Sequence, residues 1–274
     1  MTYKIVMFGL TGFGSTLLQN LIDLKQEIVY VFTKKEDAPH PYYPVKSVYD
    51  IAEQHGIPTS FLLPDNLDDD IDLVLCSTYD RILPESIFAA PKLGAFNIHP
   101  SLLPSYKGLT PTKQTLLHGE SQTGVSLHKI KHTFDTSHVI TQYPLDIDDF
   151  YDDGLLRQRL SELQYPMLTD LFDYLDSPEG YPKTLSGLPD SSYFEPFHEI
   201  KIELTPKTSI LQLSRQLRAS SPFPGLRLKY KDKYYELKKF LEYSNGKHEF
   251  NFKESGYISI FGYDGVLHCV GNSF

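Results

Sequence analysis

The 274-residue chain contains no tryptophan and only two cysteines, Cys76 and Cys269. Both cysteines lie inside apolar runs, which is typical of small buried side chains in a reducing compartment and not of a disulfide framework. No stretch approaches the roughly 20 apolar residues that a membrane-spanning helix needs, and the N-terminus has no signal-peptide cleavage pattern. These absences predict a cytoplasmic protein that does not associate with a membrane.

An excess of positive charge is also missing. The formal net charge is −9, whereas a protein that wraps a nucleic acid is usually basic. The charge is uneven, because residues 205–274 contain 11 Lys and Arg against 6 Asp and Glu. We expect Arg227, Lys229, Lys231 and Lys233 to alternate along one strand face. The composition therefore disfavours a nucleic-acid partner, with the basic C-terminal part as the exception.

Apolar runs that alternate with helical patterns predict an α/β domain at the start of the chain. The first run ends in Gly9, and Gly12 and Gly14 lead into a helical pattern, which is the opening of a parallel strand–turn–helix unit. The fold class predicted is a Rossmann-like, mostly parallel sheet. Strands are expected at 4–10, 27–33, 72–76, 94–98, 124–130 and 139–145, and helices at 15–22, 45–55, 84–89 and 112–118.

The pattern changes towards the C-terminus. Apolar residues at helical spacing predict one long helix over 155–175. A last helix is expected at 208–217, followed by short strands with hairpin-turn signals at Asn245-Gly, Ser255-Gly and Asp264-Gly. The domains predicted are a catalytic domain at 1–180, a proline-rich linker at 181–204 and a small all-β, barrel-like domain at 205–274.

The spacing of Gly9, Gly12 and Gly14 has two interpretations, a dinucleotide site or a tight strand-to-helix turn. A dinucleotide fingerprint has its glycines in the order G-x-G-x-x-G and an isolated acidic residue after the second strand. The chain has a different glycine order, and Lys34-Lys-Glu follows the second strand. The spacing therefore favours the turn over an NAD site.

The polar side chains best suited to catalysis lie at the end of the strand at 94–98. Asn97 and His99 are two residues apart, so in a strand they point to the same side, at the edge where open α/β sheets bind ligands. A carboxylate at Asp135 could lie against His99, favour its protonated form and relay a proton. Taken alone, these residues also fit a polar loop anchor and a turn residue. His128 is expected to be a core residue or part of the site wall.

Three motifs resemble the folate-dependent formyltransferase family: Phe96-Asn-Ile-His-Pro-Ser-Leu-Leu-Pro-Ser-Tyr-Lys-Gly, Thr123-Gly-Val-Ser-Leu-His and Asp135-Thr. That family carries an Asn, a His two residues later, Ser-Leu-Leu-Pro and a downstream Asp. The resemblance covers residues 1–175, and Arg218-Ala-Ser-Ser-Pro-Phe-Pro-Gly resembles the start of the family's C-terminal β domain. Ser137 departs from the pattern, because the family usually has glycine there.

The resemblance implies a mechanism without a metal. An uncharged amine attacks the formyl carbon of N10-formyltetrahydrofolate, and Asn97 and protonated His99 donate hydrogen bonds to the oxyanion, each worth about 3–4 kcal/mol. Asp135 keeps His99 charged and, through water, passes the amine proton to the departing folate nitrogen. The implied folate contacts are Arg81, Ile82, Leu83, Lys131, Thr133 and Phe134. The implied contacts to the amine substrate are Ser101, Tyr106, Lys107, Gly108 and Thr110.

The family has three classes of formyl acceptor. The purine-synthesis enzyme resembles only the first domain, so the β tail disfavours a ribonucleotide amine. Methionyl-tRNA formyltransferases carry a basic, glycine-rich insertion after the second strand, whereas residues 33–46 here are short and nearly neutral. The sequence therefore favours a nucleotide-linked amino sugar, used for surface glycans such as the O-antigen of lipopolysaccharide. Methionyl-tRNA and a non-catalytic folate- or nucleotide-binding protein remain alternatives, and a homodimer is a further expectation.

Overall fold

The structure is a computed structural model, and it describes residues 1–36, 38–131, 139–177 and 192–273. The chain divides into two compact units, each built from three separate chain segments. The first unit contains Met1–Lys107, Gly124–Leu145 and Arg157–Tyr193, and the second contains Gly108–Thr123, Asp146–Leu156 and Phe194–Phe274. The domain boundaries given by the sequence remain a prediction.

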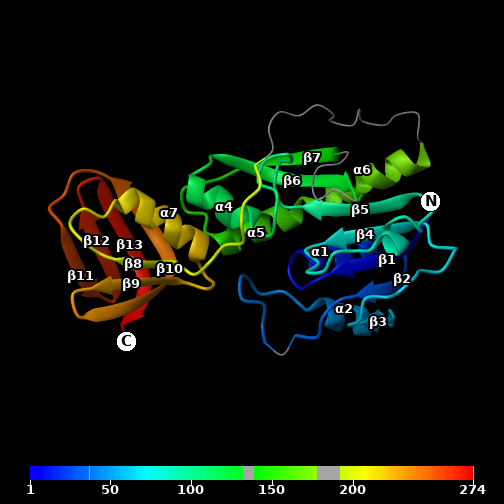
Figure 1. Cartoon of the computed structure of the whole chain (residues 1–274), viewed down its shortest axis with the longest axis horizontal. Helices are drawn as coiled ribbons and strands as arrows, with labels where there is room; N and C mark the ends of the chain where they lie inside the picture. Colours follow the sequence, from blue (N-terminus) through cyan, green and yellow to red (C-terminus); the bar gives the residue numbers. More distant parts are fainter. Residues whose placement is uncertain (37, 132–138, 178–191, 274) are drawn as a thin grey trace. The chain divides into compact units, whose positions relative to one another are not determined.

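A seven-stranded sheet forms the framework of the first unit, and its strand order is β3-β2-β1-β4-β5-β6-β7 (Figure 1). The strands β1 to β5 pair in parallel, and β6 pairs antiparallel with β5. The central strands are apolar and buried along almost their whole length, as expected for strands covered on both faces. The strands are β1 (Lys4–Gly9), β2 (Glu27–Phe32), β3 (Thr59–Ser60), β4 (Leu73–Ser77), β5 (Gly94–His99), β6 (Gln122–Lys129) and β7 (Val139–Asp146). The predicted Rossmann-like sheet is confirmed.

Three helices accompany the parallel strands. Helix α1 (Phe13–Asp23) buries Leu17, Leu18 and Leu21. Helix α2 (Val48–Gln54) begins three residues later than predicted, because Ser47 is its N-cap and accepts a hydrogen bond from the Asp50 N–H. Helix α3 (Glu85–Phe88) is one short turn.

The single helix predicted at 155–175 is wrong, because two helices cover this range. Helix α5 contains Asp153–Glu162, and helix α6 contains Gln164–Asp176. Leu163 separates the two helices and is the N-cap of α6. Pro166 explains the break, since it has no N–H to donate and its ring would clash with the carbonyl of residue 162 in a continuous helix.

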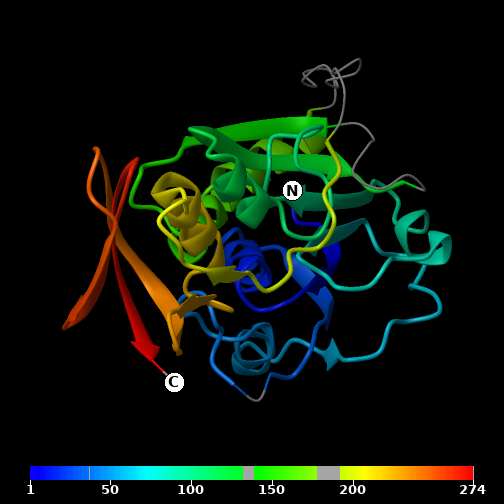
Figure 2. The ribbon, with the colours of Figure 1, turned by 60° about the vertical axis from the view of Figure 1, so that its left-hand side comes forward.

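The second unit contains a six-stranded sheet in the order β11-β12-β13-β10-β9-β8. Helix α7 (Ile210–Ser220) packs on this sheet through Ile210, Leu213 and Leu217 (Figure 2). The unit also contains helix α4 (Pro111–His118). The strands are β8 (Lys201–Glu203), β9 (Leu226–Tyr230), β10 (Lys233–Asn245), β11 (Asn251–Ser255), β12 (Tyr257–Gly262) and β13 (Gly265–Ser273). Strand β8 lies at the end of the predicted linker.

The six-stranded sheet curls towards closure. Strands β9 and β11 are separated by three other strands in the sheet order. Nevertheless, the ring of Tyr230 on β9 stacks on that of Phe252 on β11, with centroids 4.7 Å apart. Tyr235 and Phe240 are buried in the core of this sheet. The barrel-like C-terminal β domain is confirmed.

Two of the three expected hairpins form. Ser255-Gly256 joins β11 to β12, and Asp264 lies in the turn from β12 to β13. Asn245-Gly246 ends β10 but does not form a hairpin, because β10 pairs with β9 and β13 and the chain crosses to the opposite sheet edge. A hairpin at Lys231 joins β9 to β10 instead.

The prediction that four cations alternate along one strand is therefore wrong. Arg227 and Lys229 lie on β9, Lys231 lies in the hairpin turn, and Lys233 begins β10.

Within the described residues, no helix is long and apolar enough to span a lipid bilayer.

Candidate active site

The carboxyl ends of the parallel strands β1, β2, β4 and β5 share one edge of the large sheet. The strand order reverses direction between β1 and β4, and ligands of open α/β sheets bind outside such a point. Buried hydroxyl oxygens of Thr33, Ser77 and Thr78 lie at the ends of β2 and β4 and have no hydrogen-bond partner among the described residues. These hydroxyls are polar but buried, so they present no surface to a ligand at this edge.

The turn after β1 is tight and covered. A Cβ atom on Gly9 would lie 3.1 Å from the Cα of Gly14, so the strand and helix approach too closely for a side chain. Gly12 has a φ of 103°, and a Cβ there would lie 2.8 Å from Nε2 of His40. Burial lowers the pKa of this histidine, whose Nδ1 lies 3.2 Å from the carbonyl oxygen of Tyr43. The glycines thus serve the turn, and His40 occupies the space beside it.

Asn97 lies near the end of β5 and pairs across the sheet with His128 on β6. The Asn97 Nδ2 atom is 3.0 Å from His128 Nε2, and the histidine is 4% exposed. Asn97 is half-buried, so its amide is held by the sheet while remaining reachable from solvent.

His99 ends β5 and fixes the loop that follows it. Its Nε2 lies 3.0 Å from the Tyr106 carbonyl oxygen, and this carbonyl can only accept, so Nε2 carries a proton. Tyr106 adopts a φ of 57°, a conformation uncommon for a residue with a side chain. The N–H of Tyr106 donates to Ser192 Oγ at 2.8 Å, and the N–H of Lys107 donates to the Ser192 carbonyl at 2.8 Å. The loop is therefore anchored at both ends.

Two polar side chains on the neighbouring strands support the same loop from inside. Ser126 donates to the Ser101 carbonyl at 2.6 Å and accepts from the Leu103 N–H at 3.0 Å. Gln142 on β7 donates to Ser126 Oγ at 2.8 Å and to the Leu103 carbonyl at 2.9 Å. Gly124 permits this arrangement, because a Cβ there would lie 2.2 Å from the Tyr143 carbonyl oxygen. The structure therefore explains two residues of the Thr123-Gly-Val-Ser motif, Gly124 and Ser126.

One predicted substrate contact needs correction. Ser101 is fully buried, and its hydroxyl donates to the Ser105 carbonyl at 2.7 Å. It shapes the loop from within and presents no surface to a substrate. Tyr106 and Lys107 lie in the same loop of the first unit, and Lys107 is 7% exposed. Gly108 and Thr110 belong to the second unit, where Thr110 Oγ1 accepts from the Phe197 N–H at 3.1 Å.

The predicted folate contacts lie in two places. Arg81 and Ile82 are exposed after β4, whereas the Leu83 side chain is buried in the apolar core and offers only its backbone to a ligand. Beside them, Asp80 forms an ion pair with Lys34. Lys131 is exposed at the end of β6. Thr133, Phe134 and Asp135 lie outside the described residues, so the structure brings together Asn97, His99 and the Tyr106 loop.

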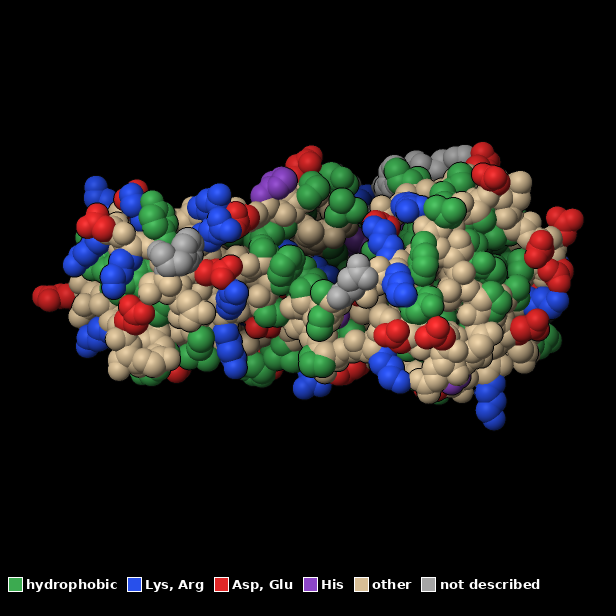
Figure 3. Space-filling view, turned by 90° about the horizontal axis from the view of Figure 1, so that it is seen from below, with side chains coloured by type: hydrophobic (Ala, Val, Ile, Leu, Met, Phe, Trp, Pro, Cys, Tyr) green, Lys and Arg blue, Asp and Glu red, His purple; other side chains and the backbone are tan. Residues whose placement is uncertain are grey.

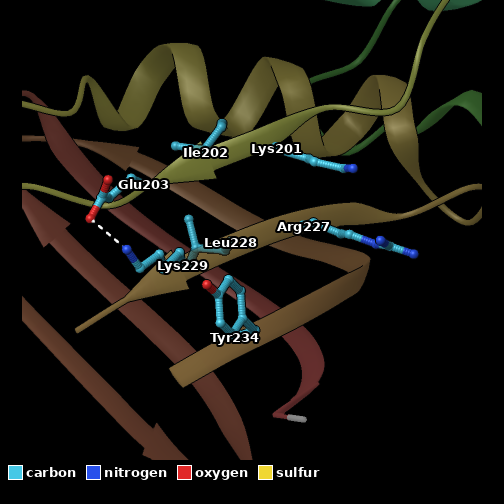
Figure 4. A pocket seen from close by; sticks show the side chains of 7 residues that line it. All are labelled: Lys201, Ile202, Glu203, Arg227, Leu228, Lys229 and Tyr234. Atoms are coloured by element: carbon cyan, nitrogen blue, oxygen red, sulfur yellow. Dashed lines mark hydrogen bonds and ion pairs between the residues drawn. The ribbon is translucent and has the colours of Figure 1, made fainter. Parts of the chain in front are cut away.

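A hollow of about 440 Å³ lies on the C-terminal sheet (Figure 4). Lys201, Arg227, Lys229 and Tyr234 line it together with Glu203, and none of these residues was predicted to be in the site. Its cations are paired, because Lys229 Nζ lies 3.2 Å from Glu203 and Arg227 Nε lies 2.7 Å from Glu199. The hollow is thus lined by ion-paired side chains of the C-terminal sheet and contains neither Asn97 nor His99.

Sequence reasoning did not find the contacts that hold these two residues. The contacts of His128, Ser126 and Gln142 form only in the observed register between strands. Ser192 lies far along the chain from the loop that it anchors.

Among the described residues, no group of three or more His, Cys, Asp and Glu side chains is arranged to hold a metal ion.

In a comparison with protein families, the formyl transferase family model aligns with residues 3–171. Among curated proteins, the methionyl-tRNA formyltransferase of Thermotoga maritima is 32% identical over an alignment of 190 residues that covers 63% of this chain and 58% of that protein. The methionyl-tRNA formyltransferase of Staphylococcus aureus is 31% identical over 177 residues. The chain thus matches less than two thirds of the length of these relatives.

Two solved structures are similar over the whole chain. WlaRD, a sugar 3N-formyl transferase solved with dTDP and 5-N-formyl-THF, has a TM-score of 0.74 at 22% identity and matches 100% of this chain and 98% of that one. The N-formyltransferase of Helicobacter canadensis, solved with folinic acid and dTDP-3-aminofucose, also has a TM-score of 0.74 at 22% identity and matches both chains over 100%. At this identity the similarity establishes the fold.

Proposed function

The chain belongs to the formyl transferase family, and from this membership we propose that it transfers a formyl group from N10-formyltetrahydrofolate to the amine of a nucleotide-linked amino sugar. The observation that carries the proposal is the position of Asn97 and His99 together at the ligand-binding edge of the sheet, beside a loop anchored from both ends. The product would enter a surface glycan such as the O-antigen of lipopolysaccharide.

The geometry supports a division of roles between the two residues. Asn97 has a side-chain nitrogen with two N–H groups, of which one is directed at His128. The second can donate to the oxyanion that forms when an amine attacks the formyl carbon. Two such preorganised donors are worth about 3–4 kcal/mol each, because they need no reorganisation when the charge develops.

His99 is proposed to act as a doubly protonated ring. Its Nε2–H already donates to the Tyr106 carbonyl, so Nδ1 is the nitrogen that would serve the oxyanion. Asp135 is proposed to hold that charged form and to pass the amine proton, through water, to the departing folate nitrogen.

The segment after β4 is accessible to the folate co-substrate. Arg81 and Ile82 are exposed there, shortly after the end of the strand. The two similar sugar formyltransferases were solved with folate derivatives, which supports the same co-substrate here. Arg81, Ile82, Leu83, Lys131, Thr133 and Phe134 are proposed as folate contacts, the buried Leu83 through its backbone.

Two observations favour a sugar amine as the acceptor. The similarity to sugar formyltransferases extends over the whole chain, including the C-terminal sheet. In addition, the segment after β2 is short, and His40 packs it against Gly12. We propose that Tyr106, Lys107, Gly108 and Thr110 contact the acceptor, and that the partners are small molecules, with a homodimer as the assembly.

Methionyl-tRNA is the second candidate acceptor, and the identity to methionyl-tRNA formyltransferases favours it. The C-terminal sheet supports methionyl-tRNA as the acceptor less than the positive net charge of residues 205–274 suggests. On the face drawn in Figure 3, cationic and anionic side chains are interspersed and form no continuous basic surface. A nucleic-acid backbone is bound mainly through the number of its phosphates that Lys and Arg neutralise, and on this sheet carboxylates such as Glu203 lie among the cations.

The test is formyl transfer from formyltetrahydrofolate to a panel of nucleotide-linked amino sugars, with charged initiator methionyl-tRNA as a parallel substrate. Transfer to one sugar and none to tRNA is the expected result. Transfer to tRNA alone would replace the sugar as acceptor. Binding of folate without transfer or hydrolysis of its formyl group would identify a non-catalytic protein.

A further inference from the structure

We propose that His128 is a positioning residue: its Nε2 atom holds the Asn97 amide in the orientation that presents an N–H group to the substrate. The inference rests on the proposed function, and it deepens the account of how the donor at Asn97 is prepared.

The atoms in contact determine the protonation of the ring. Asn97 and His128 lie directly opposite each other on antiparallel strands, and their nitrogens Nδ2 and Nε2 are 3.0 Å apart. An amide nitrogen can only donate a hydrogen bond, so the imidazole nitrogen facing it must accept. In this contact Nε2 of His128 is therefore the acceptor, which leaves Nδ1 as the nitrogen that carries the proton.

This contact links the orientation of the amide to the tautomer of His128. Rotation of the amide by half a turn would bring Asn97 Oδ1 against His128 Nε2, and that arrangement would need the ring proton on Nε2 instead of Nδ1. The observed orientation satisfies Nε2 with one N–H of the amide and leaves the second N–H of the same nitrogen for the oxyanion. Because His128 is 4% exposed, water does not compete easily for its ring. The donor is thus set before the substrate arrives, which is the condition for effective oxyanion stabilisation.

The C-terminal sheet contains a matched pair outside the proposed site. His268 on β13 lies opposite Ser259 on β12 in an antiparallel register, and its Nδ1 is 2.9 Å from the serine hydroxyl. The two histidines share a cross-strand hydrogen bond to a polar side chain, but only His128 contacts a proposed catalytic residue. Substitution of His268 therefore measures the cost of losing such a bond from a sheet.

The kinetic test compares His128→Leu, which removes the acceptor, with His128→Gln, whose side-chain oxygen can still accept from Asn97. His128→Leu should lower kcat on the order of 10-fold or more without changing KM for formyltetrahydrofolate. His128→Gln should retain most of the rate, and the control His268→Leu should match the wild type. In an Asn97→Ala background, His128→Leu should cost nothing further, because the residue through which it acts is already missing. Full additivity of the two losses, or equal losses for Leu and Gln, would overturn the inference.

A second readout does not depend on activity. Nitrogen NMR of isotope-labelled histidine in the full chain distinguishes the two neutral tautomers and the cation. We expect His128 to carry its proton on Nδ1 and its Nε2 signal to shift in Asn97→Ala. A proton on Nε2 would contradict the proposed contact. If the wild-type chain transfers no formyl group to any amine, the proposed function fails, and the tautomer alone decides whether His128 orients Asn97.

Discussion

Lys113 forms a buried ion pair whose removal should be severely destabilising. Its ammonium lies 2.9 Å from Asp153, and it also donates to the carbonyl oxygens of Ala219 and Phe223 at 2.9 and 2.8 Å. The three hydrogens of the ammonium thus have three partners. The side chains of Lys113 and Asp153 are 4% and 0% exposed, so neither charge can turn to water when its partner is lost.

Substitution of Lys113 by Met keeps the length of the side chain and removes the charge. Asp153 would then retain the bond from the Thr112 hydroxyl at 2.5 Å, while its negative charge stayed buried without a cation. Breaking a buried pair on one side costs about 3–5 kcal/mol, which is a large share of the roughly 5–15 kcal/mol that stabilises a typical domain.

The loss is measured by urea denaturation of the full chain, followed by circular dichroism, with amide hydrogen exchange of helix α7 as the local readout. The exposed pair of Arg159 and Glu162 is the matched control, and Arg159→Met should change stability by less than about 1 kcal/mol. The double variant Lys113→Met, Asp153→Leu should recover part of the loss, because no unpaired charge is left. A loss below about 1 kcal/mol for Lys113→Met alone would refute the reasoning.

Three further predictions concern catalysis, acid stability and thiol reactivity. His99→Asn should lower formyl transfer by a factor on the order of 10² or more while the chain still unfolds cooperatively in urea; near wild-type turnover would contradict the mechanism. The carboxylate of Asp264 accepts hydrogen bonds from the Ser209 hydroxyl and the Ile210 N–H at the start of α7. Burial raises the pKa of Asp264, but the effect of its hydrogen bonds is larger, so the pKa lies below the ordinary 3.8. Asp264→Ala should therefore lower the free energy of unfolding by about 1 kcal/mol near neutral pH. The difference in urea stability between the variant and the wild type should vanish as pH falls from 3.8 through the lowered pKa of Asp264. A difference that stays constant with pH would contradict this role of the carboxylate. Burial raises the pKa of Cys269 to about 12, so a thiol reagent should modify it only after unfolding, and rapid labelling of the native chain would show that the thiol is accessible.

Local patterns predicted the elements that depend on local physics. The apolar runs at β1 and β4 are buried on both faces, which is why they are recognisable without knowledge of their neighbours. The side-chain period of a strand placed Asn97 and His99 on one side of β5, and the structure holds both at the same sheet edge. Pro166, which explains the break at Leu163, was visible in the sequence, but the amphipathic pattern continues through it and conceals the end of α5.

Features that depend on strand order or register could not be read from the sequence. Asn245-Gly is a typical hairpin signal, yet the neighbours of β10 are decided by packing over the whole C-terminal sheet. The pairing of Asn97 with His128 requires the register of β5 on β6, and the anchoring of Tyr106 requires Ser192. Insertion or deletion of one residue between β5 and β6, or between Tyr106 and Ser192, would leave the local sequence patterns unchanged. The site that forms would nevertheless be different.

The chain passes between the two compact units five times, after residues 107, 123, 145, 156 and 193. A fragment that starts at residue 205 would carry α7 and most strands of the C-terminal sheet, but it would lack α4 and the partners of the carbonyls of Ala219 and Phe223. Neither unit can therefore be inherited, exchanged or expressed as one uninterrupted piece. In evolutionary terms, the two units are inherited together. Recombination after residue 123, 145, 156 or 193 would separate Lys113 from the carbonyl groups of Ala219 and Phe223 that it binds.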